Sequence, residues 1–170
     1  MPATRDKRRA ATRRKLTHFT SEGAARMVDV SGKQETLREA VAAARVTMQP
    51  STLRMILNRK VVKGDVLGVA QVAGIMAAKR TPELIPMCHP LDLSSVEIAF
   101  TPDRKTSSIA ITATVRIFGR TGVEMEALTA ACAAGLTVYD MCKSVDRAMT
   151  VTDVRLVRKT GGKSGAFVRQ

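Results

Sequence analysis

A short proline-rich loop carries the first residues that could do chemistry. Residues 87–90, with the sequence MCHP, place the Cys88 thiol next to the His89 imidazole. Neighbouring side chains point in different directions, so this pair is not expected to act as a Cys/His catalytic dyad. Two interpretations of His89 stay open: contact with a ligand, or a structural role in the loop.

Two carboxylates, Glu124 and Glu126, form the next candidate group. The spacing of Thr121 and Glu124 fits a helix capping box, which would explain Glu124 without any function. Glu126 has no such explanation, and in an extended lead-in the two carboxylates would face the same way. A metal-dependent phosphohydrolase using His89, Glu124 and Glu126 is a competing hypothesis, which full activity in chelator would exclude.

A third candidate pair, Asp140 and Lys143, is three residues apart and would share one face of a helix. A surface ion pair is one explanation. The other is that Asp140 tunes the Lys143 ammonium for acid–base work, which requires a partly buried site. Lys63 stands just before an expected helix N-terminus at Asp65, a position that favours phosphate.

The glycine-rich segment KTGGKSG at residues 159–165 suggests a phosphate loop but fails as a Walker motif. The first glycine would have to stand at position 157, which is Val157, and too few residues follow for a helix. A basic, glycine-rich flap for phosphates remains open, with Lys159 and Lys163 as its cations.

The segment 122–143, GVEMEALTAACAAGLTVYDMCK, must position two of these groups. Its middle is apolar or small and its ionisable residues stand at the two ends. This pattern predicts a helix whose middle is buried in the core and whose two ends carry the reactive side chains. At about 1.5 Å per residue, the tips lie on the order of 20–24 Å apart. Either the two ends serve different purposes, or a neighbouring subunit brings one end to the other.

The other elements follow in an order that defines a fold class. Sequence periodicity and turn signals predict strands at 36–48, 94–100, 107–119 and near 149–159, a short helix at 51–58 capped by Ser51, a helix over 65–80 with Asp65 as its cap, an irregular loop over 82–92 and a hairpin connector at 101–106. The order predicts an α+β protein, a ferredoxin-like βαββαβ sandwich whose four-stranded antiparallel sheet carries two long helices on one face. A second copy could cover the other face.

Charge and length divide the chain into an arm and a domain. The net charge is +13 over 170 residues, and residues 5–15 hold seven Lys/Arg against one Asp. We therefore expect a disordered basic arm at residues 1–15 and a single catalytic domain at residues 16–170 with a glycine-rich tail. A transit peptide or a nucleic-acid tether are alternatives for the arm.

Composition narrows the function classes for the domain. Four Phe, one Tyr and no Trp do not favour the stacking platforms of single-strand binders, so nucleic acid is not an expected partner. Three cysteines without a CxxC pair do not indicate a disulfide framework or a zinc site, which suits the reducing cytoplasm. No secretory signal or membrane span is expected.

Four strings of the chain carry a resemblance to a known family. VKGDV (62–66), AAKRTPELIPMCHPL (77–91), TGVEMEALTAACAAGLTVYDMCK (121–143) and KTGGKSG (159–165) resemble the molybdenum cofactor biosynthesis protein C family, the cyclic pyranopterin monophosphate synthases. The similarity runs from about residue 16 to residue 167 and leaves the basic arm outside.

The resemblance implies a reaction and an assembly. The enzyme would convert (8S)-3',8-cyclo-7,8-dihydroguanosine 5'-triphosphate, a small nucleotide-derived substrate, to cyclic pyranopterin monophosphate with release of pyrophosphate. It would work as a homohexamer, a trimer of dimers with active sites at the dimer interface. No cofactor is expected, and Mg²⁺ with the triphosphate is left open.

The resemblance also implies roles for individual residues. Asp140, Lys143 and Lys63 would be catalytic. The substrate would be contacted by Met87, Cys88, His89, Glu124, Met125 and Glu126, and its triphosphate would be held by Arg38 and Lys159, with Lys163 added on charge grounds.

Overall fold

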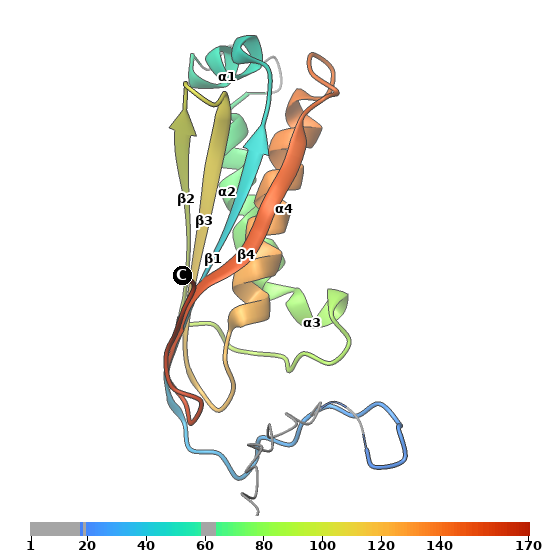
Figure 1. The fold of residues 1–170 in the computed structure, drawn as a ribbon. Coiled ribbons are helices and arrows are strands. Elements are labelled where there is room, and N and C mark those ends of the chain that lie inside the picture. Colours follow the sequence, from blue (N-terminus) through green and yellow to red (C-terminus); the bar gives the residue numbers. More distant parts are fainter. Residues whose placement is uncertain (1–17, 19, 59–63) are drawn as a thin grey trace, which may run out of the picture.

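The computed structural model describes residue 18, residues 20–58 and residues 64–170 of the chain. The expected basic arm at residues 1–15 and the candidate Lys63 therefore lie outside the described residues. In chain order the elements are β1 (Thr36–Thr47), α1 (Pro50–Leu57), α2 (Val66–Lys79), α3 (Thr81–Leu84), β2 (Ser95–Asp103), β3 (Ser108–Gly119), α4 (Glu124–Cys142), β4 (Thr150–Thr160) and β5 (Phe167–Val168) (Figure 1).

The five strands form one antiparallel sheet with the order β2-β3-β1-β4-β5. β1 lies between β3 and β4, and β2 and β3 form the predicted hairpin, with Asp103 opposite Ser108. The strands expected from the sequence are confirmed. The prediction of four strands is corrected to five, because the C-terminal tail turns back and pairs Phe167 with Lys159 at the edge of β4.

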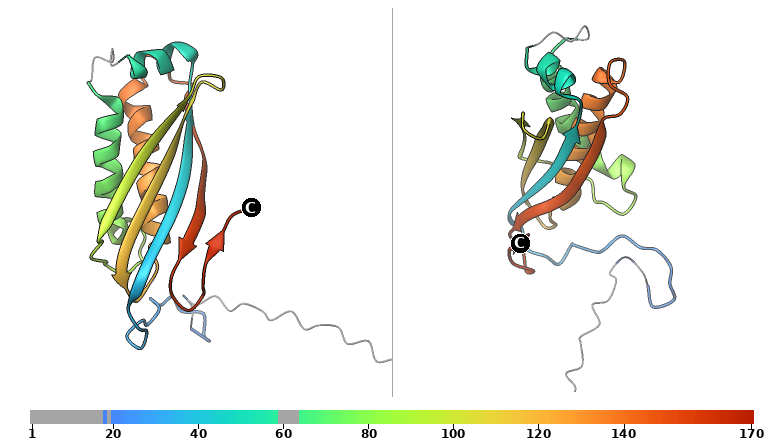
Figure 2. Two further views of the ribbon diagram at one scale, coloured as in Figure 1. Left: turned by 90° about the vertical axis from the view of Figure 1, so that its left-hand side faces the viewer. Right: turned by 45° about the horizontal axis from the view of Figure 1, so that its top comes forward.

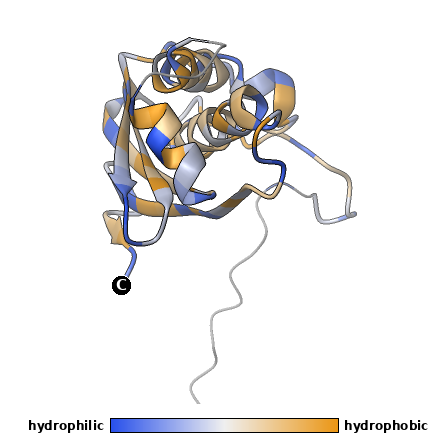
Figure 3. Ribbon diagram, turned by 90° about the horizontal axis from the view of Figure 1, so that it is seen from above, coloured by the Kyte–Doolittle hydropathy of each residue, from blue (hydrophilic) through white to orange (hydrophobic). Residues whose placement is uncertain are grey.

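Both long helices lie on the same face of the sheet (Figure 2, left). Alternate residues of the strands point to this face because successive side chains of a strand point to opposite sides. On β1 the buried series runs from Ala40 to Val46, and on β3 it runs from Ile109 to Ile117. Figure 3 shows hydrophobic residues in the strands as well as in the helices, which together enclose the core.

Small residues let the two long helices approach each other and the sheet. Ala127, Ala130, Ala131 and Ala134 of α4 are fully buried. A Cβ added at Gly74 of α2 would lie 3.1 Å from the Ala130 carbonyl oxygen, tighter than ordinary van der Waals contact. This close packing fixes the direction of α4 and therefore the place of both of its ends.

Three local predictions are corrected. The short helix begins at Pro50 after Gln49, and no side chain caps it, so Ser51 is not its cap. The apolar spacing at positions 66, 69, 70, 73 and 77 predicts that these residues share one face of α2. The buried positions are instead 66, 70, 74 and 78, and Val69 is 47% exposed. The proline-rich loop contains one helical turn, α3, because the Thr81 hydroxyl donates to two carbonyls at the end of α2. The Asp65 cap of α2 is confirmed by its hydrogen bond from Gly68 N–H.

The other face of the sheet carries an ion-pair network instead of helices. Glu39 of β1 accepts hydrogen bonds from Arg116 of β3 and Arg158 of β4, each at 2.6 Å, and Arg116 also pairs with Glu97 of β2. Near this network Leu37 and Phe118, which are opposite each other in the register, are about two-thirds exposed. Apolar and charged groups are thus available on this face for contact with another surface.

Candidate active site

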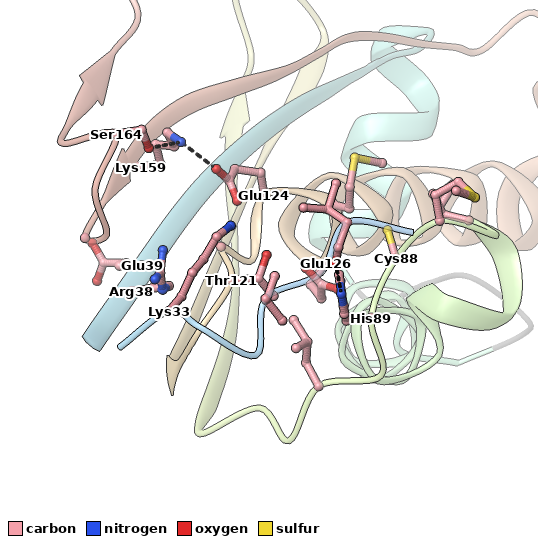
Figure 4. A pocket seen from close by; sticks show the side chains of 18 of the residues that line it. Lys33, Arg38, Glu39, Cys88, His89, Thr121, Glu124, Glu126, Lys159 and Ser164 are labelled. Carbon is pink, nitrogen blue, oxygen red and sulfur yellow. Dashed lines mark hydrogen bonds and ion pairs between the residues drawn. The ribbon is translucent and has the colours of Figure 1, made fainter. Parts of the chain in front are cut away.

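A cavity of about 720 Å³ opens at the end of the sandwich where α4 begins. Its walls come from four segments that are far apart in the sequence: the stretch before β1, the loop after α3, the start of α4 and the glycine-rich loop after β4 (Figure 4). Most of the residues expected from the sequence to form a site line it: Arg38, Met87, Cys88, His89, Glu124, Met125, Glu126 and Lys159.

His89 ties the N-terminal stretch to the cavity. Its Nε2 donates a hydrogen bond of 2.8 Å to the Val28 carbonyl oxygen, and Val28 itself lines the cavity. His89 therefore has a structural contact and a position in the cavity wall at the same time, so the two interpretations of this residue do not exclude each other.

Glu124 is not part of a capping box. The N-cap of α4 is Val123, with no side-chain cap, and Glu124 is the first residue of the helix. Its carboxylate pairs instead with the Lys159 ammonium at 2.8 Å, and the same ammonium donates to the Ser164 hydroxyl at 3.1 Å (Figure 4). The start of α4 is thereby linked to the glycine-rich loop.

Glu126 follows Glu124 by two residues in α4, and its side chain is buried, with 3% of the residue exposed. Burial is the main cause that raises the pKa of its carboxyl from an ordinary 4.5 to about 7, and the Glu124 charge contributes in the same direction. Burial, followed by the neighbouring Glu126, also raises the pKa of the Cys88 thiol, which keeps it protonated. The two carboxylates do not face the same way from an extended lead-in, because both belong to the helix.

Arg38 is held by a hydrogen bond to β3 and by the close approach of the glycine-rich loop. Its Nε donates to the Gly119 carbonyl oxygen at 2.8 Å. Gly161 and Gly162 both have positive φ, 90° and 74°, and a Cβ at Gly162 would overlap the Arg38 guanidinium. The glycines of the KTGGKSG string are therefore needed for the turn and for the close approach of the backbone to this side chain.

Asp140 and Lys143 lie at the opposite end of α4 and do not line the cavity. The expected pair is confirmed, with 2.6 Å between Lys143 Nζ and Asp140 Oδ1, and the side chains are 52% and 60% exposed. The hydrogen bond that the Lys143 ammonium donates to Asp140 raises the pKa of Lys143. Along the helix axis Asp140 is about 21 Å from Glu126. Lys163 is exposed and does not line the cavity either.

Sequence reasoning did not assign several polar residues that line the cavity, among them Lys33, Glu39 and Ser164. Lys33 lies in an irregular stretch, where no periodicity assigns a direction to its side chain. Glu39 follows Arg38 in a strand, and alternation alone would have placed it on the opposite face. Of these three residues, only Ser164 could have been identified from the sequence, because it belongs to the KTGGKSG string.

Two other kinds of feature are absent from the described residues. No group of three or more His, Cys, Asp or Glu side chains in that part of the chain could hold a metal ion. No helix there has the length and apolarity needed to cross a membrane.

A cavity that combines fixed cations with a buried carboxyl, an imidazole and a thiol belongs to an enzyme that acts on an anionic small molecule. The comparisons name its family. The MoaC family model matches residues 27–162, and the chain belongs to the MoaC family.

Relatives are similar over nearly their whole length. The cyclic pyranopterin monophosphate synthase of Rhodospirillum rubrum is 62% identical over 157 residues, which cover 92% of this chain and 95% of the relative. The protein of the same name from Pelotomaculum thermopropionicum is 60% identical over 155 residues, covering 91% of each chain.

Proposed function

We propose that the chain is a cyclic pyranopterin monophosphate synthase of molybdenum cofactor biosynthesis. It converts (8S)-3',8-cyclo-7,8-dihydroguanosine 5'-triphosphate to cyclic pyranopterin monophosphate and pyrophosphate. The observation that carries this proposal is the cavity in which Cys88, His89 and Glu126 lie together with Arg38 and Lys159. The names of the relatives support it.

The cavity suggests how the substrate is oriented. Arg38, Lys33 and Lys159 supply cations for the triphosphate, with Lys163 available from the same glycine-rich loop. Met87, Cys88, His89, Met125 and Glu126 line the part of the cavity formed by the loop after α3 and the first turn of α4, where the ring system would bind. Opening one ring and closing another requires several proton transfers, for which a carboxyl with a pKa of about 7 is suited.

The remaining acid–base groups reach the cavity from a second chain. Asp140 stands about 21 Å and Lys143 about 25 Å along α4 from Glu126, too far for one bound molecule to contact both ends. A homohexamer, arranged as a trimer of dimers, would bring these residues and Lys63 of one copy to the cavity of another. The exposed Leu37 and Phe118 and the ion-pair network on the uncovered face offer surface for contact between copies.

Within this site Lys143 and Lys63 do acid–base work and Asp140 orients Lys143. The raised pKa of Lys143 keeps it protonated at neutral pH, so it enters the reaction as a cation and proton donor. No cofactor is required, and Mg²⁺ can accompany the triphosphate without a dedicated protein site. The enzyme is a cytoplasmic protein whose catalytic domain spans residues 16–170.

The finer fold class belongs to the same proposal. The strand order β2-β3-β1-β4, with both long helices on one face, supports a ferredoxin-like βαββαβ sandwich to which β5 is added at the edge.

The decisive experiment is an activity assay on the purified protein. The cyclic dihydroguanosine triphosphate is added, and pyrophosphate and the fluorescent oxidised pterin are followed. We expect both products, their loss in Lys143→Ala, and their persistence in chelator. A Lys143→Ala protein with near-normal turnover would refute the catalytic assignment. A well-folded wild-type protein that makes neither product would refute the function.

A further inference from the structure

Lys159 makes two contacts that tie it to both sides of the cavity mouth. Its ammonium lies 2.8 Å from a Glu124 carboxylate oxygen on α4 and 3.1 Å from the Ser164 hydroxyl on the glycine-rich loop. The Lys159 and Glu124 side chains are 26% and 29% exposed, so solvent and a small anion can both reach the pair. The cation assigned to substrate phosphate is thus already neutralised by a carboxylate.

The backbone at Gly122 makes this pairing possible. The Glu124 carboxylate folds back over Gly122, and a Cβ added there would overlap its oxygens. Gly122 is not among the glycines with positive φ, so an alanine is conformationally acceptable at this position. The absence of a side chain at Gly122 therefore gives the carboxylate its place beside Lys159.

The other two carboxyl groups of the cavity are engaged differently. Glu39 accepts hydrogen bonds from Arg116 and Arg158, which belong to the uncovered face of the sheet. Glu126 is buried and no ion pair with a cavity cation is recorded for it among the described residues. Glu124 is the carboxylate whose partner is a cation that lines the cavity.

We propose that Glu124 is a displaceable counter-ion of Lys159, which competes with substrate phosphate for the ammonium and is released when phosphate binds. Phosphate offers several charged oxygens where Glu124 offers two, so a diphosphate can replace it at Lys159 and also contact Arg38. The released carboxylate, two residues before Glu126 on α4, becomes available to hydrogen-bond the reacting ring system. The inference rests on the proposed assignment of phosphate to Lys159.

Titration of the full-length protein with inorganic pyrophosphate tests the competition. We expect Glu124→Gln and Gly122→Ala each to bind pyrophosphate more tightly than the wild type, by roughly 2- to 5-fold, the range for a partly exposed ion pair. Lys159→Gln should bind more weakly and should abolish the gain from either change when combined with it. Gly32→Ala is the matched control, because a Cβ at Gly32 meets nothing within 4 Å.

Gly122→Ala separates displacement from simple repulsion, because it leaves every charge in the cavity. If Glu124 only repels anions through space, Glu124→Gln will tighten binding, Gly122→Ala will not, and the gain will persist in the Lys159→Gln background. That result overturns the inference and leaves the proposed function standing. If neither the wild type nor any variant binds pyrophosphate, the inference falls together with the assignment of phosphate to Lys159, and the function is decided by the activity assay alone.

Folding is checked by the thermal unfolding midpoint of each variant. Should Gly122→Ala fail to fold, the double-mutant cycle between Glu124→Gln and Lys159→Gln decides. A coupling of at least 2-fold in the dissociation constant supports displacement, and additive effects overturn it.

Discussion

Glu126 is the residue whose chemistry depends most on its surroundings. In water its carboxyl would be ionised at neutral pH, but burial at the start of α4 raises its pKa to about 7. Near pH 7 both protonation states are therefore populated, which is the condition under which a carboxyl can donate and accept protons in one catalytic cycle.

The raised pKa of Glu126 has a consequence for stability. Between the ordinary pKa of 4.5 and the folded pKa of about 7 the unfolded chain is ionised while the folded chain keeps the proton, so rising pH favours unfolding. We expect Glu126→Gln to be close to the wild type in stability at pH 4.5 and more stable at pH 8, by a difference of up to about 3 kcal/mol.

Denaturant unfolding at both pH values, compared with Glu83→Gln, measures this difference. Glu83 is exposed and provides the same chemical change at the surface. If the difference in unfolding free energy between Glu126→Gln and the wild type does not grow as pH rises, Glu126 is not a buried, protonated carboxyl.

The Asp140–Lys143 pair should determine part of the pH dependence of the activity. The hydrogen bond that the Lys143 ammonium donates to Asp140 is the largest cause of the raised pKa of Lys143. Asp140→Asn removes the charge and should lower this pKa, so the basic limb of the pH–activity profile moves to lower pH. Lys143→Ala should lose activity by about 10²- to 10⁴-fold at every pH. If the basic limb of the profile does not move in Asp140→Asn, a group other than Lys143 causes that limb.

Much of the cavity was predictable at the residue scale, and the reason is chemical. His89, Cys88 and Glu126 were identified because residue types with proton-transfer chemistry stood in short, marked strings. The Glu124–Lys159 pair was not, because 35 positions of chain separate the partners and only the fold brings them together. The capping-box prediction for Glu124 was wrong because a local sequence pattern contains no information about Lys159, a partner far away in the chain.

At the scale of elements, Asp146 holds α1 to the turn between α4 and β4. It is 2% exposed and accepts hydrogen bonds from Gln49 N–H and the Thr52 hydroxyl. We expect Asp146→Ala to lower the free energy of unfolding by about 2–3 kcal/mol, because the buried Thr52 hydroxyl and the Gln49 N–H lose a charged acceptor. Asp92→Ala, at an exposed position, is the control for the loss of charge. A change below 1 kcal/mol, measured by urea unfolding, would mean that water replaces the carboxylate.

The contact between α2 and α4 depends on the absence of a side chain at Gly74. A Cβ there already comes within 3.1 Å of the Ala130 carbonyl oxygen and within 3.2 Å of Ile98. We expect Gly74→Val to push the helices apart and destabilise the fold by about 1–3 kcal/mol. Gly32→Val, in open space, serves as the control. An unchanged thermal midpoint in Gly74→Val would show that the helices adjust at no cost.

Element types followed from the sequence because periodicity reports which face is buried. The alternation in β1 and β3 predicted both the strands and their core faces. Prediction was weaker for α2, where small residues occur on every side, and the buried positions are decided by helix packing. The two-residue β5 has no periodicity of its own and exists only because β4 offers an edge.

At the scale of the whole molecule, the proposed division of the site between copies can be tested by complementation. Lys143→Ala and Arg38→Ala should each be inactive alone. Mixed assemblies should recover about a quarter of the wild-type activity, because random pairing makes half of the pairs mixed and each mixed pair contains one intact site. Recovery should require co-expression or subunit exchange. Mixed assemblies without activity would place all catalytic groups in one chain.

The bond between His89 and Val28 fixes more than the position of a loop. A carbonyl oxygen cannot donate, so His89 Nε2 carries the hydrogen and a neutral ring is held as the Nε2–H tautomer. Its basic nitrogen is then Nδ1, and protonation there strengthens the bond to Val28, since the donor becomes cationic. Proton transfer at Nδ1 therefore leaves the hydrogen bond between the imidazole and the N-terminal stretch in place.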